Sequence, residues 1–388
     1  MTYQSLKKQK PMSLPKIDVT IIDFDDIKNP LLSGGQARAT FEVAKNLVEM
    51  GHSVTVISSR FPGSKDQKNK GIYYKHIGLG TGNIKLNNAV FFLALPFAVK
   101  SIYSDVILEC FTAPISTSFA PIFTKIPVIG MPTMFEAGEF SKKYHLPFDL
   151  VEKLGCRHYK YFLAYSKINK KKMHSMNKKV FTKIIPNGVD EDFFKIKTKE
   201  GEYALFIGRI DIVQKGLDLL LNACEKNNIK LAIKIVIAGN GTPEEENKLQ
   251  KMIKEKNLSN SVTFVGRVDG KRKLDLLANS MFGIYPSRFE DFPLVPLEFT
   301  SLGKPLVCFD IKGLNWVTPE VSVKVKPFDE NALAAAIRLM ASKQTLRNKL
   351  KRGTRVFAKN YGWKNISKMY EQFFLEVIKM DSTKGIGT

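Results

Sequence analysis

The stretch Ile17-Asp-Val-Thr-Ile-Ile-Asp-Phe24 is rich in β-branched residues and leads into the glycine pair Gly34-Gly35. Such a run predicts a strand that ends in a tight turn. From Ala37 to Met50 apolar residues recur at helical spacing, and a second β-branched run, Ser53-Val-Thr-Val-Ile-Ser58, follows. The order of strand, glycine turn, helix and strand predicts a βαβ unit, whose parallel strands are covered by helices on both faces.

The alternation of strands and helices starts again after about residue 185. Further strands are expected at 106–109, 128–131, 203–207, 234–238, 262–265, 282–285 and 305–309. Because a length of 388 residues also exceeds what one hydrophobic core supports, we expect an α/β protein with two doubly wound, Rossmann-like domains. The predicted division is 1–185 for the N-terminal domain, 186–360 for the C-terminal domain, and 361–388 for a last helix with a tail.

The composition is that of a globular protein, with 44% apolar and 25% charged residues. Its four cysteines lie far apart and form no C-x-x-C pair, which favours a reduced, cytoplasmic setting over a disulfide framework or a zinc site. The amino terminus carries lysines without the apolar core of a signal peptide. The longest apolar stretch, Ala89 to Val99, contains Pro96 and is too short to cross a bilayer, so we expect a buried helix there.

A net charge of +23 is the most unusual bulk property of the chain. It favours contact with nucleic acid, an anionic membrane or phosphorylated small molecules, although a lysine-rich composition with solvated side chains explains it equally well. The stretch Lys167 to Lys179 carries six lysines around Ile168, Met173 and Met176. It is either a basic amphipathic surface for the inner face of an anionic membrane or an exposed helix flank. Nucleic-acid binding is the less favoured alternative, since no zinc spacing, helix-turn-helix or RNA-binding signature accompanies the charge.

The segment most informative about function is Pro286-Ser-Arg-Phe-Glu-Asp-Phe-Pro-Leu-Val-Pro-Leu-Glu-Phe-Thr-Ser-Leu-Gly-Lys-Pro305. A helix is expected to begin near Leu294, because Pro296 suits a first helical turn. Free N–H groups at such a start attract an anion such as phosphate. Glu298 would then lie in the first turn, within reach of ribose hydroxyls, and Glu290 on the preceding loop at the carboxyl end of a strand. For either glutamate alone, a purely structural role is the simpler interpretation.

A second group of polar residues follows the strand at 203–207, where Arg209 and Lys215 leave the carboxyl edge of a parallel sheet. Both are expected to converge on one diphosphate, since a guanidinium offers a planar fork and an ammonium a compact charge. Cations fixed there would stabilise the charge that a leaving nucleoside diphosphate gains in the transition state. Among sixty basic residues the pair alone is a weak signal. The turn Gly239-Asn-Gly241 follows the next strand and permits a close approach of backbone to a ligand.

Taken in order, these elements resemble glycosyltransferase family 4, whose members have the GT-B fold of two Rossmann-like domains facing across a cleft. The resemblance covers residues 17 to 375 and rests most specifically on Arg209, Lys215 and the E-x7-E segment from Glu290 to Glu298. Further matching motifs are Gly34-Gly35, Pro186-Asn-Gly-Val-Asp190, Gly239-Asn-Gly241 and Phe264-Val-Gly266. The resemblance implies a hexosyltransferase that uses a nucleotide-diphosphate sugar, retains the anomeric configuration and needs no metal or other cofactor.

On the matching positions, the resemblance implies that Arg209 and Lys215 bind the donor diphosphate, with Glu290 beside the donor sugar and Glu298 on the ribose. Arg209, Lys215 and Glu290 are then the catalytic residues. The other predicted donor-binding positions are Gly34, Gly35, Gly239, Gly241, Val268, Phe292, Leu294 and Val295. The acceptor is expected to be a glycan or a lipid-linked intermediate of cell-envelope or glycoconjugate synthesis, and the last helix is expected to pack back onto the N-terminal domain.

The chain departs from the family pattern in its cleft. Many members have a histidine where Pro132-Thr133 stands, and Asp291 and Pro293 replace glycines, so we expect a stiffer loop and a different donor preference. Two other functions stay open. A nucleotide-sugar 2-epimerase shares the architecture, although such enzymes need further catalytic carboxylates and a histidine in the cleft. The motif Asp23-Phe-Asp25 resembles the D-x-D that holds a divalent cation in single-domain transferases.

Overall fold

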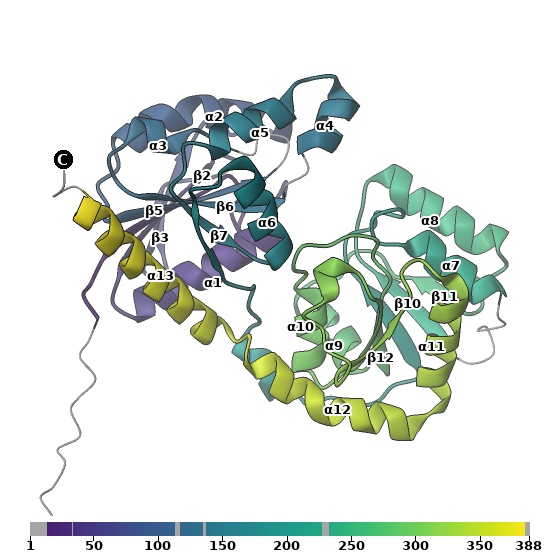
Figure 1. Cartoon of the computed structure of the whole chain (residues 1–388). Coiled ribbons are helices and arrows are strands. Elements are labelled where there is room, and N and C mark those ends of the chain that lie inside the picture. Colours follow the sequence, from purple (N-terminus) through teal and green to yellow (C-terminus); the bar gives the residue numbers. More distant parts are fainter. Residues whose placement is uncertain (1–13, 33, 113–116, 135–136, 227–232, 385–388) are drawn as a thin grey trace, which may run out of the picture.

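Two α/β units lie side by side in the computed structural model, which describes residues 14–384 except 33, 113–116, 135–136 and 227–232 (Figure 1). The first unit contains an eight-stranded sheet and the second a six-stranded sheet. The strands of the second sheet are parallel, and the first sheet departs from this only at β3, which is antiparallel to β4. The predicted fold class, two doubly wound Rossmann-like domains, is therefore confirmed.

The first sheet begins with the strand predicted from the opening β-branched run. Its strands are β1 (Asp18–Asp23), β2 (Ser53–Ser59), β3 (Gln67–Asn69), β4 (Ile72–Ile77), β5 (Val106–Thr112), β6 (Val128–Met134), β7 (Tyr161–Ala164) and β8 (Phe181–Ile184). Their order across the sheet is β3-β4-β2-β1-β5-β6-β7-β8. Because β1 pairs with β2 on one side and with β5 on the other, the direction of strand addition reverses between β1 and β5. Open α/β sheets bind ligands at such a switch point, beyond the carboxyl ends of the strands.

The second sheet repeats this arrangement. Its strands are β9 (Tyr203–Ile207), β10 (Lys234–Ala238), β11 (Val262–Phe264), β12 (Phe282–Tyr285), β13 (Leu306–Phe309) and β14 (Ser322–Val325). The order is β11-β10-β9-β12-β13-β14, with the switch point between β9 and β12. The loops that follow these two strands contain the residues that the sequence singled out, Arg209 and Lys215 after β9 and Glu290 after β12.

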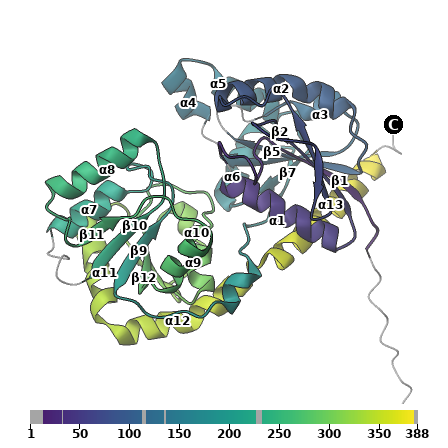
Figure 2. The same cartoon turned by 180° about the vertical axis from the view of Figure 1, so that it is seen from behind.

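Helices cover both faces of each sheet (Figures 1 and 2). Those of the first unit are α1 (Gly35–Glu49), α2 (Ile84–Lys100), α3 (Ala120–Phe123), α4 (Ala137–Tyr144), α5 (Phe148–Cys156) and α6 (Lys167–Met176). The later helices are α7 (Leu217–Lys226), α8 (Pro243–Glu255), α9 (Gly270–Ala278), α10 (Val295–Ser301), α11 (Glu330–Ser342), α12 (Gln344–Lys359) and α13 (Trp363–Lys384). In the first unit, α1 and α13 pack on one face of the sheet and α2, α3, α5 and α6 on the other.

The last helix leaves the second unit and returns to the first, as predicted. The N–H of Trp363 donates to the carbonyl of Val189 at 3.1 Å, at the point where the two chain segments cross between the units. From there α13 runs along α1 and buries Phe373 and Phe374 in the core of the first unit. The second unit has its own core, built around its sheet. The domain boundaries at residues 185 and 360 stay predictions.

The apolar stretch within α2 is not the fully buried helix that we expected. A single stripe, Asn87, Phe91, Leu95 and Val99, faces the sheet. The opposite side is open, and the side chains of Leu93 and Phe97 are 73% and 75% exposed. The prediction was wrong because a helix that is apolar all round carries no periodicity from which to tell a covered side from an open one. In the described parts of the chain, none of the helices combines the length and apolarity needed to cross a bilayer.

The lysine-rich stretch from Lys167 to Lys179 forms α6 and the turn after it. Met173 is buried in the core, and Met176 packs against the same core. The apolar side of this helix therefore faces the protein interior, and its exposed surface consists mainly of lysines. This arrangement matches the simpler of the two interpretations, an exposed helix flank.

Candidate active site

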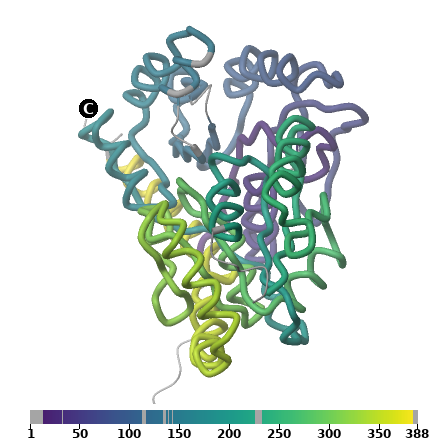
Figure 3. The backbone as a smooth tube through the Cα atoms, turned by 90° about the vertical axis from the view of Figure 1, so that its right-hand side faces the viewer, coloured from purple at the N-terminus to yellow at the C-terminus, as the bar shows by residue number. Residues whose placement is uncertain are grey.

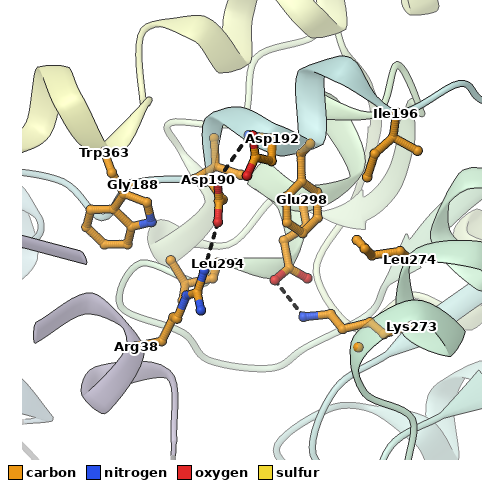
Figure 4. A pocket seen from close by; sticks show the side chains of 13 residues that line it. Arg38, Gly188, Asp190, Asp192, Ile196, Lys273, Leu274, Leu294, Glu298 and Trp363 are labelled. Carbon is orange, nitrogen blue, oxygen red and sulfur yellow. Dashed lines mark hydrogen bonds and ion pairs between the residues drawn. The ribbon is translucent and has the colours of Figure 1, made fainter. Parts of the chain in front are cut away.

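Two cavities lie at the carboxyl ends of the strands, where loops of the two units meet. The first, which we call the Glu298 cavity, has a volume of about 410 Å³. It is lined by Arg38 from α1, Asp190 from the segment that connects the units, Lys273 from α9, and Leu294 and Glu298 from the start of α10 (Figure 4). Charged side chains of both signs thus face one hollow between the units.

The second cavity, which we call the Glu290 cavity, has a volume of about 630 Å³. The first unit contributes Thr133, from the end of β6, and Ile168, from α6. The second unit contributes Gln214, Arg288, Glu290, Asp291, Phe292 and Pro293, together with residues that follow β13 and β14. Thr133, at the position where the resemblance leads one to expect a histidine, therefore shares a cavity with Glu290.

Lys215 and Glu290 meet at the switch point of the second sheet. The Nζ of Lys215 lies 2.5 Å from Oε1 of Glu290, and their side chains are only 12% and 9% exposed. The hydroxyl of Tyr285, the last residue of β12, donates to the same carboxylate oxygen at 2.9 Å. Burial, followed by the neighbouring Glu290 carboxylate, raises the pKa of Tyr285 well above its ordinary value, so this hydroxyl stays protonated. The result is an ordered cation and carboxylate beside a cavity.

Arg209 leaves the same strand as Lys215 but has other partners. Its guanidinium donates to Oε1 of Gln214 at 2.5 Å and lies 3.8 Å from Asp211, and its side chain is 62% exposed. The structure therefore places Arg209 and Lys215 on one loop, each with its own partner. Gln214 lines the Glu290 cavity, so Arg209 is linked to that cavity through the amide it contacts.

Glu298 lies in the first turn of α10, as the position of Pro296 predicted. Its Oε1 accepts from Nζ of Lys273 at 2.6 Å, and the two side chains are 14% and 30% exposed. Its Oε2 is buried and has no hydrogen-bond partner within the described part of the chain. A buried carboxylate oxygen without a donor is costly, so this atom is suited to accept from a ligand hydroxyl in the Glu298 cavity.

The loop between Glu290 and Glu298 is held from several sides. Phe292 stacks on Trp316 with ring centroids 4.3 Å apart, and its carbonyl accepts from Nδ2 of Asn187 at 3.0 Å. Leu294 is the residue before α10, and Val295 begins the helix. The predicted donor-binding stretch is thus tied both to the core and to the segment that connects the units.

The glycine pair of the first unit faces this loop across the gap between the units. Gly34 precedes α1, and its N–H donates to Oδ2 of Asp25 at 2.7 Å. A Cβ atom on Gly35 would lie 3.5 Å from Cδ1 of Leu294. The start of α1 therefore lies close to the start of α10, at a distance that a Cβ atom on Gly35 would fill with an ordinary van der Waals contact. The predicted donor contacts of Gly34 and Gly35 stay predictions.

The carboxylates of the Asp23-Phe-Asp25 motif bind protein groups. Asp23 is fully buried, and its Oδ2 accepts from Thr40 at 2.6 Å. Desolvation by burial, opposed mainly by the bond from Thr40, raises its pKa to about 7. Asp25 holds Gly34, as above. Across the described ranges, no group of three or more His, Cys, Asp or Glu side chains is arranged to hold a metal ion.

The two glycines after β10 have a structural reason to be glycine. Gly239 has a φ of +143°, and a Cβ atom there would lie 1.7 Å from the carbonyl oxygen of Gly208. A Cβ on Gly241 would lie 2.3 Å from the carbonyl oxygen of Ile210. Both therefore let this turn pack against the loop that carries Arg209. Val268, the remaining predicted position, is half-buried against the core of the second unit. The predicted donor contacts of these three residues stay predictions.

Sequence reasoning missed several residues that complete the site. Lys273 contacts Glu298, Tyr285 contacts Glu290, and Arg38 contacts both Asp190 at 2.8 Å and Glu42 at 2.7 Å. Asp190 belonged to a recognised motif, but nothing in the sequence paired it with Arg38. The position of Tyr285 at the end of a buried strand was a usable signal, whereas Lys273 and Arg38 were two among sixty basic residues.

Two family descriptions match successive parts of the chain. Residues 188–357 match Glycosyl transferases group 1, and residues 33–193 match Glycosyltransferase Family 4. An uncharacterized glycosyltransferase of Methanocaldococcus jannaschii is 24% identical over 231 residues, which are 55% of this chain and 63% of that protein. The match thus spans less than two thirds of the length of this relative.

Solved structures share the two-unit fold. Sucrose-phosphate synthase from Thermosynechococcus elongatus is similar with a TM-score of 0.76 and 18% identity, covering 94% of this chain and 99% of that chain. Anabaena HepE, solved in complex with UDP-glucose, is similar with a TM-score of 0.71 and 16% identity, covering 93% of this chain and 100% of that chain. At such low sequence identities these similarities establish the fold of the backbone alone.

Proposed function

Because the chain belongs to the GT-B glycosyltransferases, with a family 4 first half and a group 1 second half, we propose that it transfers a hexose from a nucleotide-diphosphate sugar to an acceptor. In this proposal the donor binds the second unit, the acceptor approaches from the first, and the anomeric configuration is retained. Side-chain cations offset the phosphate charge, so the reaction takes no metal.

The observation that carries the proposal is the pair of carboxylates at the two ends of one short loop. Glu290 is paired with Lys215 at the β9–β12 switch point, and Glu298, which lines the neighbouring cavity, has one carboxylate oxygen without a hydrogen-bond partner in the described part of the chain. A nucleotide-diphosphate sugar has its ribose, diphosphate and hexose in that order. We assign the ribose to Glu298, the diphosphate to Lys215, Arg209 and the backbone of 292–295, and the hexose to Glu290.

Bond changes in the proposed transfer balance without a further reactant. The acceptor hydroxyl oxygen bonds to the anomeric carbon while the bond from that carbon to the diphosphate oxygen breaks. The leaving diphosphate keeps the electron pair of that bond, and one of its oxygens takes up the acceptor proton. Lys215 and Arg209 stabilise the charge that grows on the diphosphate, which lowers the barrier because their positions are fixed before the reaction.

Two contacts in the structure would be exchanged when the donor binds. The ribose hydroxyls would donate to Glu298, whose Oε1 now accepts from Lys273 and whose Oε2 is free. Arg209 would turn from Gln214 toward the diphosphate, a movement that its exposure permits. Lys215 needs no such rotation, since Glu290 already holds it at the switch point.

The acceptor is proposed to be a glycan or a lipid-linked intermediate, reached from the cytoplasmic side with a peripheral contact to an anionic membrane. Thr133 and Ile168 of the first unit line the Glu290 cavity, which gives an acceptor a route to the hexose. The net charge of +23 would favour a phosphate-bearing acceptor and an anionic surface.

A thermal-shift screen of nucleoside diphosphates and their hexose derivatives tests the proposal. The donor that binds the native state will raise the melting temperature, since a ligand at about 100 times its Kd adds about 2.7 kcal/mol. Incubation of that donor with acceptor should then release nucleoside diphosphate. A change of the donor sugar without this release would indicate an epimerase and contradict the proposal, as would a screen in which no nucleotide stabilises the protein.

A further inference from the structure

A third cavity lies in the first unit and is not used by the proposed transfer machinery. We call it the α2–α4 groove; its volume is about 450 Å³. Its lining is mainly apolar and includes Leu32, Ala89, Phe92, Phe140, Tyr144 and Phe148. Polar groups come from Lys85, Asn88 and Thr112. This size and composition are those of a site for a small organic ligand.

The groove lies at the switch point of the first sheet. Phe24, which follows β1, and Thr112, which ends β5, both line it. In the second sheet the loops at the equivalent place carry Lys215 and Glu290. The groove therefore occupies the position where an open α/β sheet binds its ligand, on the side of the molecule from which an acceptor would enter.

The wall formed by α2 continues onto an exposed apolar surface. On the side of α2 that faces away from the sheet, Leu86, Leu93 and Phe97 are 45%, 73% and 75% exposed. Lys85 and Lys100 stand at the two ends of the helix, and its sequence contains no acidic residue. We call this surface the α2 face. The helix α2 lies along the outer edge of the first unit (Figures 1 and 3), and residues of α4 and α5 line the groove beside it.

We propose that the α2 face docks on an anionic lipid surface and that the α2–α4 groove binds the hydrocarbon chain of a lipid acceptor drawn from it. This second proposal rests on the transferase function proposed above and names a lipid as the class of acceptor. The apolar side chains would insert among the acyl chains while Lys85 and Lys100 contact anionic headgroups. A hydrocarbon chain bound in the groove would bring the lipid headgroup toward the cleft between the units, because Phe24 and Thr112, which line the groove, lie at the carboxyl edge of the sheet.

The chemistry of this surface favours a lipid over a protein partner. A protein interface carries about one hydrogen bond per 100–200 Å² and a polar rim. The α2 face presents aliphatic and phenyl groups between two cations, with no exposed acid on the helix to pair with a partner's lysines or arginines. The same reasoning disfavours a second copy of this chain, because two +23 molecules would bring like charges together.

Vesicle binding tests the docking surface. The full chain should sediment with vesicles of phosphatidylglycerol and phosphatidylcholine and much less with phosphatidylcholine alone. The double variant Leu93→Asp, Phe97→Asp should bind the mixed vesicles at least roughly tenfold more weakly, since a carboxylate at an inserted position opposes entry. The double variant Leu339→Asp, Val356→Asp is the matched control, because these side chains are 41% and 69% exposed on α11 and α12 of the second unit and the change in charge is the same; it should leave binding unchanged.

An alkyl phosphate tests the groove. Dodecyl phosphate, used below its micelle concentration, should raise the melting temperature of the wild type, whereas inorganic phosphate should not. Ala89→Trp, an exposed groove position, should abolish the dodecyl phosphate shift without lowering the melting temperature of the free protein. An equal response to both phosphates, or an unchanged shift in Ala89→Trp, would overturn the groove assignment.

The two proposals fail in different measurements. Equal vesicle binding by the wild type and the Leu93→Asp, Phe97→Asp variant would overturn the docking surface, as would a concentration-dependent dimer that this variant abolishes. In either case the rise in melting temperature that a nucleoside diphosphate causes by binding the second unit would be unaffected. Loss of that nucleotide response in the wild type would instead contradict the transferase proposal while leaving the vesicle result standing.

Discussion

The two units share one strand order around their switch points, but the loops at those points differ in chemistry. In the second unit the loops after β9 and β12 carry the ion pair between Lys215 and Glu290, beside a cavity whose lining includes several charged side chains. In the first unit the loops after β1 and β5 open into the largely apolar α2–α4 groove. We infer that the sheet topology sets the place of a ligand site and that the loops at that place set which ligand it can bind.

The carboxylates near the first switch point accept hydrogen bonds from other groups of the protein. Oε1 of Glu109 accepts from the N–H of Ser118 at 3.0 Å and its Oε2 accepts from the hydroxyl of Tyr159 at 2.6 Å, and burial raises its pKa. Asp23 and Asp25 hold the loop that leads to Gly34. Glu290 and Glu298 of the second unit also bind protein groups, but both line cavities. The predictions below test this contrast.

The largest effect is expected from Lys215→Ala. Removing a cation fixed at the leaving group should lower kcat by roughly 10² to 10³, the loss typical when one charge-stabilising group is removed. The rate at which nucleoside diphosphate is released at saturating donor gives kcat. Lys251→Ala on α8, whose side chain is 74% exposed, is the matched control. If both variants have the same kcat, the ammonium of Lys215 does not stabilise the leaving group.

Glu298→Ala should act mainly on donor affinity. Losing hydrogen bonds to a charged acceptor costs about 1.5–3 kcal/mol, so KM for the donor should rise by roughly tenfold or more while kcat changes less. Steady-state kinetics with varied donor gives both values. Glu255→Ala, an exposed position on α8, is the control. A KM equal to that of the control would remove Glu298 from the donor site.

Asp23→Asn should change the pH dependence of stability. The folded-state pKa of Asp23 is raised to about 7 from an ordinary value of 3.8, so the contribution of this group is fully present below pH 3.8 and is lost as pH rises through 7. In this window the wild type should lose stability by up to roughly 1.4 kcal/mol per pH unit from this group. Urea unfolding at a series of pH values should show a flatter profile for the variant. An identical slope would mean that Asp23 titrates normally.

The smallest effect is expected from Asp190→Asn, which removes one charge of the ion pair that joins α1 to Asp190 and leaves the contact of Arg38 with Glu42 intact. The side chains of Arg38 and Asp190 are 45% and 27% exposed, so water screens the pair and the loss of stability should stay below about 1 kcal/mol. Urea unfolding measures this directly. A loss of several kcal/mol would show that the two units depend on this bridge and are not held mainly by the return of α13.

Much of the fold could be predicted because strong local patterns decide it. The strands at 203–207, 234–238 and 282–285 have the predicted bounds, since each is a buried apolar run between turn residues. The sequence does not predict β7 and β8. No glycine or proline turn lies directly beside β7, and β8 contains Thr182 and Lys183 in place of a continuous apolar run. The open side of α2 was missed because tertiary packing alone decides which side of an apolar helix is covered.

The site was predictable only in part. The position of Glu298 in a first helical turn followed from Pro296, and Lys215 and Glu290 were each placed beyond the carboxyl end of a predicted strand. Their direct contact was not predicted. The sequence did not predict which side chains Arg209 and Lys273 contact, Gln214 and Glu298. The side chains of Arg209 and Lys273 are long and flexible, so sequence spacing fixes the position of the backbone and leaves the direction of the charged end to packing and to nearby carboxylates.

A crystal structure of the protein with the nucleoside diphosphate that gives the largest thermal shift would test the central claim most directly. We expect the diphosphate within hydrogen-bond distance of Nζ of Lys215 and the ribose hydroxyls on Oε2 of Glu298. A nucleotide seated in the first unit, or in the second unit away from both side chains, would contradict it.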